Sequence, residues 1–351
     1  MTDWRRIAVR LLLLAALSVV GAIVAILLKL PIPLLIGPAI ATTIGALCGL
    51  DLRFPKPLRN AVFLVAGVAI GATVSPASVV ALTKWPFAFA ILGFSLIAMV
   101  LLGRRLMQHL MSTDARSALL AATPGHLSYV IALGEDLKLP TERVAIVQSI
   151  RLLALTLAVP FAAYLAGIET GVGITPSDTT EMTLLQTALC LLAAAALAPL
   201  AIYLRIPAAT LIAGMAVGAA ARLTGFTPGT LSYWIAYPAL AAIGALIGTR
   251  FVGISLQDLR QSAFAGLAGT TLAALITLLA ALAAMRIVDM PLLHVLVAFA
   301  PGGLETMTVM GVAIGANPGF VAAAHVARLL LLSVLIPVMI GRAQGPLPAP
   351  R

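Results

Sequence analysis

Two arginines lie inside apolar segments, and each follows a Pro-Gly pair in the segment before it. When the chain is compared with itself at an offset of 177 residues, Pro124 falls on Pro301 and Arg151 falls on Arg328. A guanidinium group presents a planar fork of donors that suits a carboxylate or a phosphate. An arginine in the middle of a membrane span costs roughly 2.5–3.5 kcal/mol, so it must face the protein interior and find a partner. The pattern predicts an anion site, or arginines that bind main-chain carbonyl groups; the two roles are compatible.

The Pro-Gly pairs are themselves candidates for a binding site. Pro124-Gly125 and Pro301-Gly302-Gly303 interrupt segments that are otherwise apolar. Proline removes a backbone donor and glycine loosens the chain, so peptide groups are freed where a helix would use them. At membrane depth such a break is tolerated only if it is buried in protein or lines a wet cavity. Matched breaks in two repeats indicate the binding site of a transporter. The alternative is that each break is a simple helix kink packed against neighbouring helices, without a binding role.

Further polar residues accompany these breaks, and the two copies differ in them. Glu305 stands where the first copy has Ser128, and it could take up a proton or sodium ion or pair with Arg328 or Arg151. The histidines near the breaks could relay protons, hydrogen-bond a solute or serve structure alone. The predicted substrate-binding residues are Pro124, Gly125, His126, Ser128, Arg151, Pro301, Gly302, Gly303, Glu305, His325 and Arg328.

Composition indicates an integral membrane protein of the all-α class. Hydrophobic residues make up 62% of the 351 positions and charged residues 10%, against about half and about a quarter in a soluble chain. The formal charge of +10 is spread singly or in pairs at helix ends, which argues against a direct nucleic-acid partner. Cys48 and Cys190 are expected to pack, and the sequence has no nucleotide loop or zinc-binding histidine pair. We therefore expect no enzyme activity, metal or cofactor.

The chain divides into two tandem membrane repeats. We predict a first repeat at 1–168, a polar acidic linker at 169–181 and a second repeat at 182–351. About ten transmembrane helices are expected, with broken Pro-Gly segments at about 117–134 and 291–315. The predicted spans are 7–28, 32–50, 60–82, 86–103, 143–167, 182–204, 207–222, 231–250, 262–285 and 319–341. Glycines four residues apart are expected to let helices approach closely, and they are Gly67/Gly71, Gly244/Gly248, Gly45/Gly49, Gly214/Gly218 and Gly311/Gly315.

Loop charges bear on the symmetry of the two repeats. If each Pro-Gly segment crosses the membrane, the repeats lie parallel; if it re-enters, they are inverted. With the N-terminus in the cytoplasm, most basic loop residues of the first repeat fall inside, as the positive-inside rule prefers. Re-entry then places the acidic linker outside and, in the second repeat, Arg205, Arg250, Arg260 and Arg342 inside. The inverted arrangement is therefore the prediction, with both termini in the cytoplasm.

The motifs resemble those of the AbrB family of bacterial membrane proteins. The resemblance rests on Leu35-Ile36-Gly37-Pro38, on Thr123-Pro124-Gly125-His126-Leu127 and on Ala300-Pro301-Gly302-Gly303-Leu304-Glu305, each set in the same tandem duplication. It implies a bacterial inner-membrane location and the labels that members carry, which are regulator of gene expression and ammonia monooxygenase. Neither label follows from the residues, because no DNA-binding module or set of copper or iron ligands is evident.

The favoured function is transport of a small solute. The two breaks and their arginines predict a midplane site for an anion such as a carboxylate, with proton or sodium coupling through Glu305. The alternative is a membrane-embedded regulator that acts through a partner protein without transport, and a weaker one is an oxygenase subunit. The lipid bilayer is an obligatory partner, and a homo-oligomer is compatible with the sequence.

Overall fold

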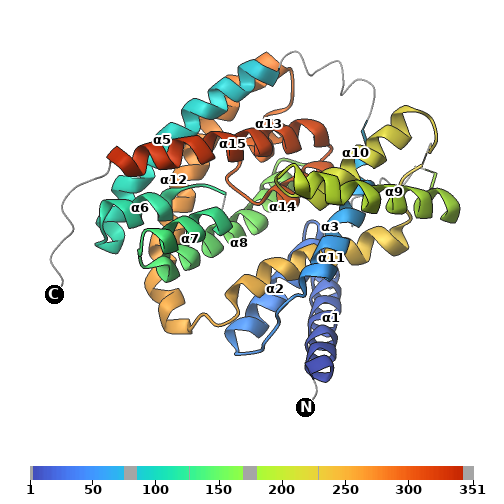
Figure 1. Ribbon diagram of the computed structural model, residues 1–351, viewed down its shortest axis with the longest axis horizontal. Helices are drawn as coiled ribbons and strands as arrows, with labels where there is room; N and C mark the ends of the chain where they lie inside the picture. The colour runs from blue at the N-terminus through green and yellow to red at the C-terminus, as the bar shows by residue number, and fades with distance from the viewer. Residues whose placement is uncertain (1–2, 75–84, 126, 169–179, 228, 343–351) are drawn as a thin grey trace. The chain divides into compact units, whose positions relative to one another are not determined.

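The computed structural model describes residues 3–74, 85–125, 127–168, 180–227 and 229–342. This part of the chain is built from helices, with one isolated bridge between Glu181 and Thr230, and the predicted all-α class is confirmed (Figure 1). In chain order the helices are α1 Asp3–Leu27, α2 Pro33–Leu47, α3 Lys56–Gly71, α5 Trp85–Met111, α6 Ala115–Ala122, α7 Leu127–Asp136, α8 Thr141–Leu165, α9 Leu184–Tyr203, α10 Ala209–Leu223, α11 Tyr233–Gly248, η2 Thr249–Phe251, α12 Leu256–Val288, α13 Leu292–Phe299, α14 Leu304–Ala313 and α15 Pro318–Arg342.

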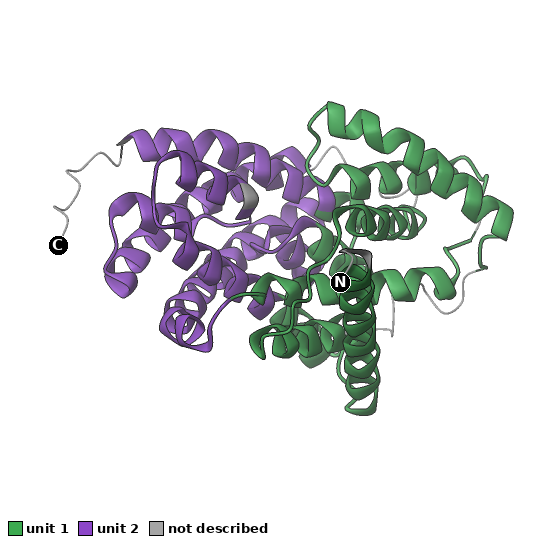
Figure 2. Ribbon diagram, turned by 60° about the horizontal axis from the view of Figure 1, so that its bottom comes forward, with its two compact units in different colours: residues 1–81, 156–253, 305–321 green, residues 82–155, 254–304, 322–351 purple. Residues whose placement is uncertain are grey.

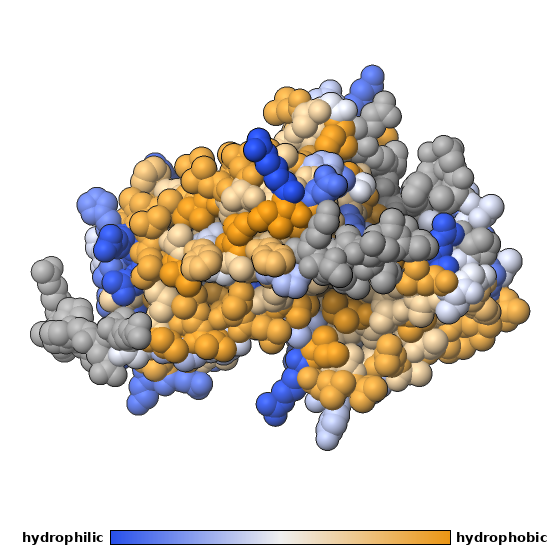
Figure 3. All heavy atoms as spheres, turned by 90° about the horizontal axis from the view of Figure 1, so that it is seen from above, coloured by the Kyte–Doolittle hydropathy of each residue, from blue (hydrophilic) through white to orange (hydrophobic). Residues whose placement is uncertain are grey.

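The helices have the length and composition of a membrane-embedded protein. Among the described residues, seven are long and apolar enough to cross a bilayer, and they lie in α1, α5, α8, α9, α11 with η2, α12 and α15. The shorter apolar helices α2, α10 and α14 accompany them. Figure 3 shows a face dominated by apolar residues, with hydrophilic ones in small groups. Large side chains such as Leu165 and Leu184 are exposed on helices, a surface that suits lipid rather than water.

Every predicted span contains a helix, although some bounds differ. The span predicted at about 60–82 is helical as α3 only to Gly71, and residues 75–84 are outside the described part. Most of the predicted linker at 169–181 is outside it as well. Ten spans, their direction through the membrane and the position of the termini relative to the cytoplasm stay predictions.

Both Pro-Gly segments are broken helices, as predicted. The first is α6, a break that includes residues 123–125, and α7; the second is α13, a break at residues 300–303, and α14. With 8 and 10 residues, these pieces are about 12 and 15 Å long, so none crosses about 30 Å of hydrocarbon alone. Each break therefore leaves helix ends whose carbonyl groups need donors from elsewhere.

The helices group into two compact units (Figure 2). Unit 1 contains residues 1–81, 156–253 and 305–321, and unit 2 contains residues 82–155, 254–304 and 322–351. Each unit takes segments from both predicted repeats. Unit 2 holds both breaks and both buried arginines, so the candidate site can be described within it.

Helices of unit 1 pair across the repeats through glycines. A Cβ on Gly67 of α3 would lie 3.0 Å from the Cα of Gly214 on α10, and one on Gly71 would lie 3.0 Å from the Cα of Gly218. Residue numbers rise together along the contact, so α3 and α10 run in the same direction. In the equivalent pair, α2 and α11, a Cβ on Gly244 would lie 3.2 Å from the Cα of Leu35, so the main chains again approach closely. The predicted close packing by these glycines is confirmed.

Two other glycines that share this spacing do not pack. Gly49 and Gly315 follow helix ends with φ of +87° and +78°, and a Cβ would meet nothing within 4 Å of either. They end helices by adopting the left-handed conformation, which glycine tolerates. The duplication is visible in this conformation, since matched positions share it: Lys29 with Arg205, Ile32 with Ala208, Gly49 with Gly225, and Lys138 with Gly315.

Candidate functional site

The first break is held by two side chains of α8. Nη2 of Arg151 donates to the carbonyl oxygen of Thr123 at 3.0 Å, and Nε2 of Gln148 donates to that of Leu120 at 3.0 Å. Gln148 and Arg151 are three residues apart, so they share a helix face. Both acceptors belong to the C-terminal end of α6, whose last carbonyl groups have no partner within the helix. The arginine also places positive charge at the negative end of the α6 dipole.

The second break is held by Arg328 of α15. Its Nη1 donates to the carbonyl oxygen of Ala300 at 2.5 Å, and its Nη2 donates to that of Gly302 at 2.7 Å. Ala300 is the C-cap residue of α13, so the geometry repeats that of Arg151 and α6. The prediction that these arginines bind carbonyl groups freed at the breaks is confirmed in both copies.

The two breaks come together within unit 2. A Cβ on Gly125 would lie 2.9 Å from Nη2 and 3.0 Å from Nε of Arg328, so the guanidinium group of the second copy lies on the main chain of the first break. Gly125 has a φ of +87°, which favours glycine at this position. Arg151 and Arg328 are close enough to repel one another electrostatically. Gly125, Gly302 and both arginines therefore lie together in one positively charged region of unit 2.

Both arginines are buried, and no described residue of the same unit is their acidic partner. Their exposed fractions are 6% for Arg151 and 1% for Arg328. The ion pairs formed among the described residues join Asp51 to Arg10 and Arg53, all of which lie in unit 1. Main-chain carbonyl groups offset part of a buried positive charge, but they do not neutralise it. An anion bound here would offset the remainder.

The arginines differ in how many donors remain. Both terminal nitrogens of Arg328 donate hydrogen bonds to main-chain carbonyl oxygens, and its Nε is buried without a hydrogen-bond partner among the described residues. Arg151 uses Nη2 alone, and among the described residues its Nε and Nη1 form no hydrogen bond yet are not fully enclosed. Of the two, Arg151 is the one that can present donors to a ligand.

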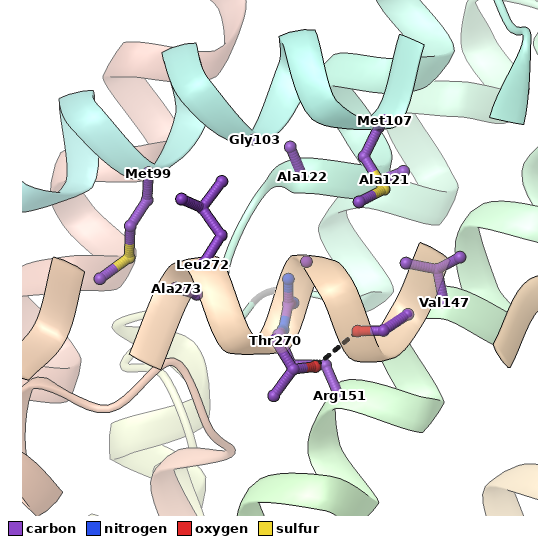
Figure 4. Close-up of a pocket in the computed structure, with 12 residues that line it drawn as sticks. Met99, Gly103, Met107, Ala121, Ala122, Val147, Arg151, Thr270, Leu272 and Ala273 are labelled. Carbon is purple, nitrogen blue, oxygen red and sulfur yellow. Dashed lines mark hydrogen bonds between the residues drawn. The ribbon is translucent and has the colours of Figure 1, made fainter. Parts of the chain in front are cut away.

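Arg151 lines a hollow in unit 2 (Figure 4). The hollow is partly open to the surroundings and has a cavity volume of about 20 Å³, enough for a water-sized group. Figure 4 shows α5 and α12 on either side of it, with Met99, Met107 and Leu272 among the side chains that line it. Its wall is completed by Gly103, Ala121, Ala122, Val147, Gly266, Gly269, Thr270 and Ala273. The hydroxyl group of Thr270 donates to the carbonyl oxygen of Gly266 at 2.7 Å, so its oxygen keeps acceptor capacity.

The remaining predicted residues have different locations. Pro124, Pro301 and His325 are buried in unit 2, and His325 lies three residues before Arg328 on α15. His126 is outside the described residues, and Ser128 lies in α7 with its side chain outside them. Both positions stay untested as site residues.

Glu305 lies at the start of α14, within unit 1. In that unit it attracts the guanidinium group of Arg250, which Arg59 repels. Its predicted pairing with Arg151 or Arg328 stays a prediction. Arg250 was missed in the sequence because it ends an apolar helix, where an arginine is ordinary.

The walls of the hollow were also missed. Methionine, alanine and leucine on α5 and α12 carry no signal that separates a binding surface from ordinary packing. Gln148 is aligned with His325 when the chain is compared with itself, and it lies one helical turn before Arg151 on the same face.

Comparison with known proteins gives one family and two relatives. The family described as "Transition state regulatory protein AbrB" matches residues 34–344. The chain is 26% identical over 335 residues to "Putative regulator AbrB" of Escherichia coli (strain K12), which covers 92% of this chain and 93% of the relative. It is 24% identical over 301 residues to "Uncharacterized protein YhjN" of Bacillus subtilis (strain 168), which covers 78% of this chain and 75% of the relative. Neither name specifies a solute.

Proposed function

This chain belongs to the AbrB family, as its Pro-Gly motifs predicted, and we propose that it is a membrane transporter of a small anionic solute. The observation that carries the proposal is the pair of buried arginines at two helix breaks in unit 2, where none of the described residues is a carboxylate partner. Broken helices at matched positions of two repeats are a recurrent design for solute sites in transporters.

The breaks supply what a site at membrane depth requires. Peptide groups at a break can be stable in lipid only when protein or a wet cavity satisfies them. Here arginines satisfy part of them, and the hollow beside Arg151 offers space next to one of the breaks. An anion that enters would meet a guanidinium group already held in place by its bond to Thr123.

Glu305 is the proposed coupling residue. A carboxylate in an apolar helix can exchange a proton or bind sodium during transport. Its neighbour Arg250 supplies a positive charge that would compete with a bound proton or cation. Coupling through Glu305 therefore predicts that the transport rate depends on pH or on sodium concentration. The substitution Glu305→Gln should remove this dependence.

The test is uptake of labelled anions into liposomes that contain the purified protein, measured at several pH values. We expect accumulation above that of protein-free liposomes, and a loss of at least tenfold in Arg151→Ala and Arg328→Ala. Arg286→Ala is the matched control, because this arginine is exposed on α12. If both buried-arginine variants transport as well as the control does, the proposed anion site is wrong.

A regulatory role without transport is the competing function, and the name of the Escherichia coli relative is the observation that favours it. It predicts that no anion is accumulated under any condition, while deletion of the gene still changes expression of other genes. We place the protein in the bacterial inner membrane with both termini in the cytoplasm, as a transporter and not as an enzyme.

A further inference from the structure

We propose that the hollow of unit 2 binds one monatomic anion of the size of chloride, held by the N–H groups that Arg151 keeps free. The inference rests on the anion site of the proposed function and names the class of anion that this site takes. It depends on the size of the hollow, on the charge around it and on the donors of one guanidinium group.

The hollow has room for one small group. Its cavity volume of about 20 Å³ is somewhat more than the roughly 10–15 Å³ that one water molecule needs, so a single atom a little larger than a water oxygen fits. A carboxylate, a nitrate or a phosphate has three or more heavy atoms and would have to displace the wall. Size therefore selects a monatomic ion among the common anions.

The charge around the hollow favours an anion over a water molecule. Arg151 and Arg328 are both buried, and they lie close enough to repel one another. Among the described residues of unit 2, no acidic side chain pairs with either of them. Main-chain carbonyl groups accept their hydrogen bonds without removing the net charge. A water molecule would leave that charge as it is, whereas a halide ion beside Arg151 offsets one positive charge.

The guanidinium group of Arg151 keeps a pair of adjacent donors. It has five N–H groups in a planar fork, and Nη2 shares one edge of this fork with Nε and another with Nη1. Nη2 donates to the carbonyl oxygen of Thr123, which uses one of its two N–H groups. Both N–H groups on one of the two edges therefore stay free. Nε and Nη1 are not fully enclosed, so a small ion can reach either edge.

The rest of the wall suits a ligand of one atom. Of the twelve lining residues only Arg151 is charged, and only Thr270 adds a polar side chain (Figure 4). The hydroxyl group of Thr270 donates to the carbonyl oxygen of Gly266, so it offers no donor to a second anionic atom. In a polyatomic anion each oxygen would need donors of its own, and a buried oxygen without one is costly. A halide ion leaves no such atom.

The nearby end of α6 does not prevent anion binding. Ala121 and Ala122 belong to its C-terminal turn and line the hollow, and a helix C-terminus carries a partial negative charge of about half an elementary charge. Arg151 supplies a full positive charge at the same end and already donates to the carbonyl oxygen of Thr123. The net charge beside the hollow is therefore positive.

The first experiment measures binding of labelled chloride to the purified protein in detergent at neutral pH, with gluconate keeping the ionic strength constant. We expect saturable binding of one ion per chain. Unlabelled bromide should compete nearly as well as chloride, iodide less well because it is larger, and acetate more weakly than chloride by about tenfold or more. Acetate that competes as well as chloride, or the absence of saturable chloride binding, would overturn the inference.

A matched pair of glycine substitutions locates the ion. A Cβ on Gly269 would lie 2.8 Å from Cε of Met107, so Gly269→Ala adds a methyl group in the wall of the hollow. A Cβ on Gly93 of α5 would meet Cδ1 of Leu331 at an ordinary 3.7 Å, outside the hollow. Gly269→Ala should weaken chloride binding by about tenfold, while Gly93→Ala keeps the affinity of the unaltered protein. Thermal unfolding in gluconate first establishes that both variants fold. An unchanged affinity in folded Gly269→Ala contradicts the placement of the ion.

Arg151→Gln tests the charge. This variant should lose saturable chloride binding, and chloride should no longer raise its unfolding temperature as it does for the unaltered protein. Arg286→Ala, at the exposed arginine of α12, should keep both properties. Saturable chloride binding in Arg151→Gln would contradict the inference. If Arg151→Gln does not fold, the glycine pair decides.

The outcomes separate the class of anion from transport itself. If labelled carboxylates are taken up in a manner that depends on Arg151, but chloride does not bind, the monatomic inference fails and the transporter stands. If chloride binds as expected and no anion is taken up, the binding site stands and transport fails.

Discussion

The two Pro-Gly breaks are copies of one another, yet their arginines serve them differently. Arg328 commits both terminal nitrogens to the second break and is almost wholly enclosed, with Gly125 of the first break against it. Arg151 commits one nitrogen to the first break and lines the hollow. The difference teaches that a duplicated residue can keep its structural bond in both copies while only one copy retains donors for a ligand.

The accompanying residues differ in the same way. Gln148 assists Arg151 by binding the carbonyl oxygen of Leu120, and the matching residue of the second copy is the fully buried His325. The first break also turns through a glycine with positive φ at Gly125, whereas Gly302 is not among the described glycines with that conformation. Each copy has therefore reached its own solution to the same problem of freed carbonyl groups.

The largest expected effect is a difference in the free energy of unfolding between variants of the two arginines. A buried acceptor that loses its donor costs about 1–3 kcal/mol, so Arg328→Ala should lower the free energy of unfolding about twice as much as Arg151→Ala. Thermal unfolding of the purified variants in detergent measures this, with the exposed Arg286→Ala as the control. Equal losses in the two variants would remove the structural distinction between the breaks.

The next effect concerns the backbone of the first break. Gly125→Ala should lower the free energy of unfolding by about 1–2 kcal/mol, since an alanine at positive φ is strained. The added Cβ would also displace the guanidinium group of Arg328. Gly302→Ala is the comparison from the second break and should cost less. A larger loss in Gly302→Ala would show that the second break has the stricter backbone.

The smallest effect compares the starts of α6 and α13. Asp114 caps α6 by accepting hydrogen bonds from the backbone N–H groups of Arg116 and Ser117 at 3.1 Å, whereas Pro291 caps α13 without a side-chain bond. Asp114→Ala should therefore cost about 1 kcal/mol or less, because the carboxyl group is partly exposed. Thermal unfolding near neutral pH, with Asp114→Asn as the conservative variant, measures it.

The cap has a pH dependence of known sign. Partial burial raises the pKa of Asp114, but hydrogen bonds from Ser117 and Arg116 outweigh this and leave the pKa below its ordinary value of 3.8. A lowered pKa in the folded state adds stability above pH 3.8, and that contribution is lost as the pH falls below it. The difference between the unaltered protein and Asp114→Asn should therefore shrink in acid. A difference that grows in acid would contradict this assignment.

Much of the fold could be predicted because its causes are local. Apolar runs of about 20 residues predict membrane helices, and a proline followed by glycine frees peptide groups within such a run, so both broken segments were found. Gly67 and Gly71 were correctly expected to pack, but their partner helix could not be read from one segment. Gly49 and Gly315 share the spacing and do something else, because spacing alone does not give backbone conformation.

The sequence by itself determined that this chain is an all-α membrane protein with two helix breaks and that Arg151 and Arg328 must find partners. These conclusions follow from hydrophobicity and from the chemistry of single residues, which act wherever the residue stands. Only the tertiary structure decided which carbonyl group each arginine binds and which arginine keeps free donors. That choice depends on α5 and α12, whose ordinary apolar side chains line the hollow, the farthest being Ala273, 122 residues after Arg151 in the chain.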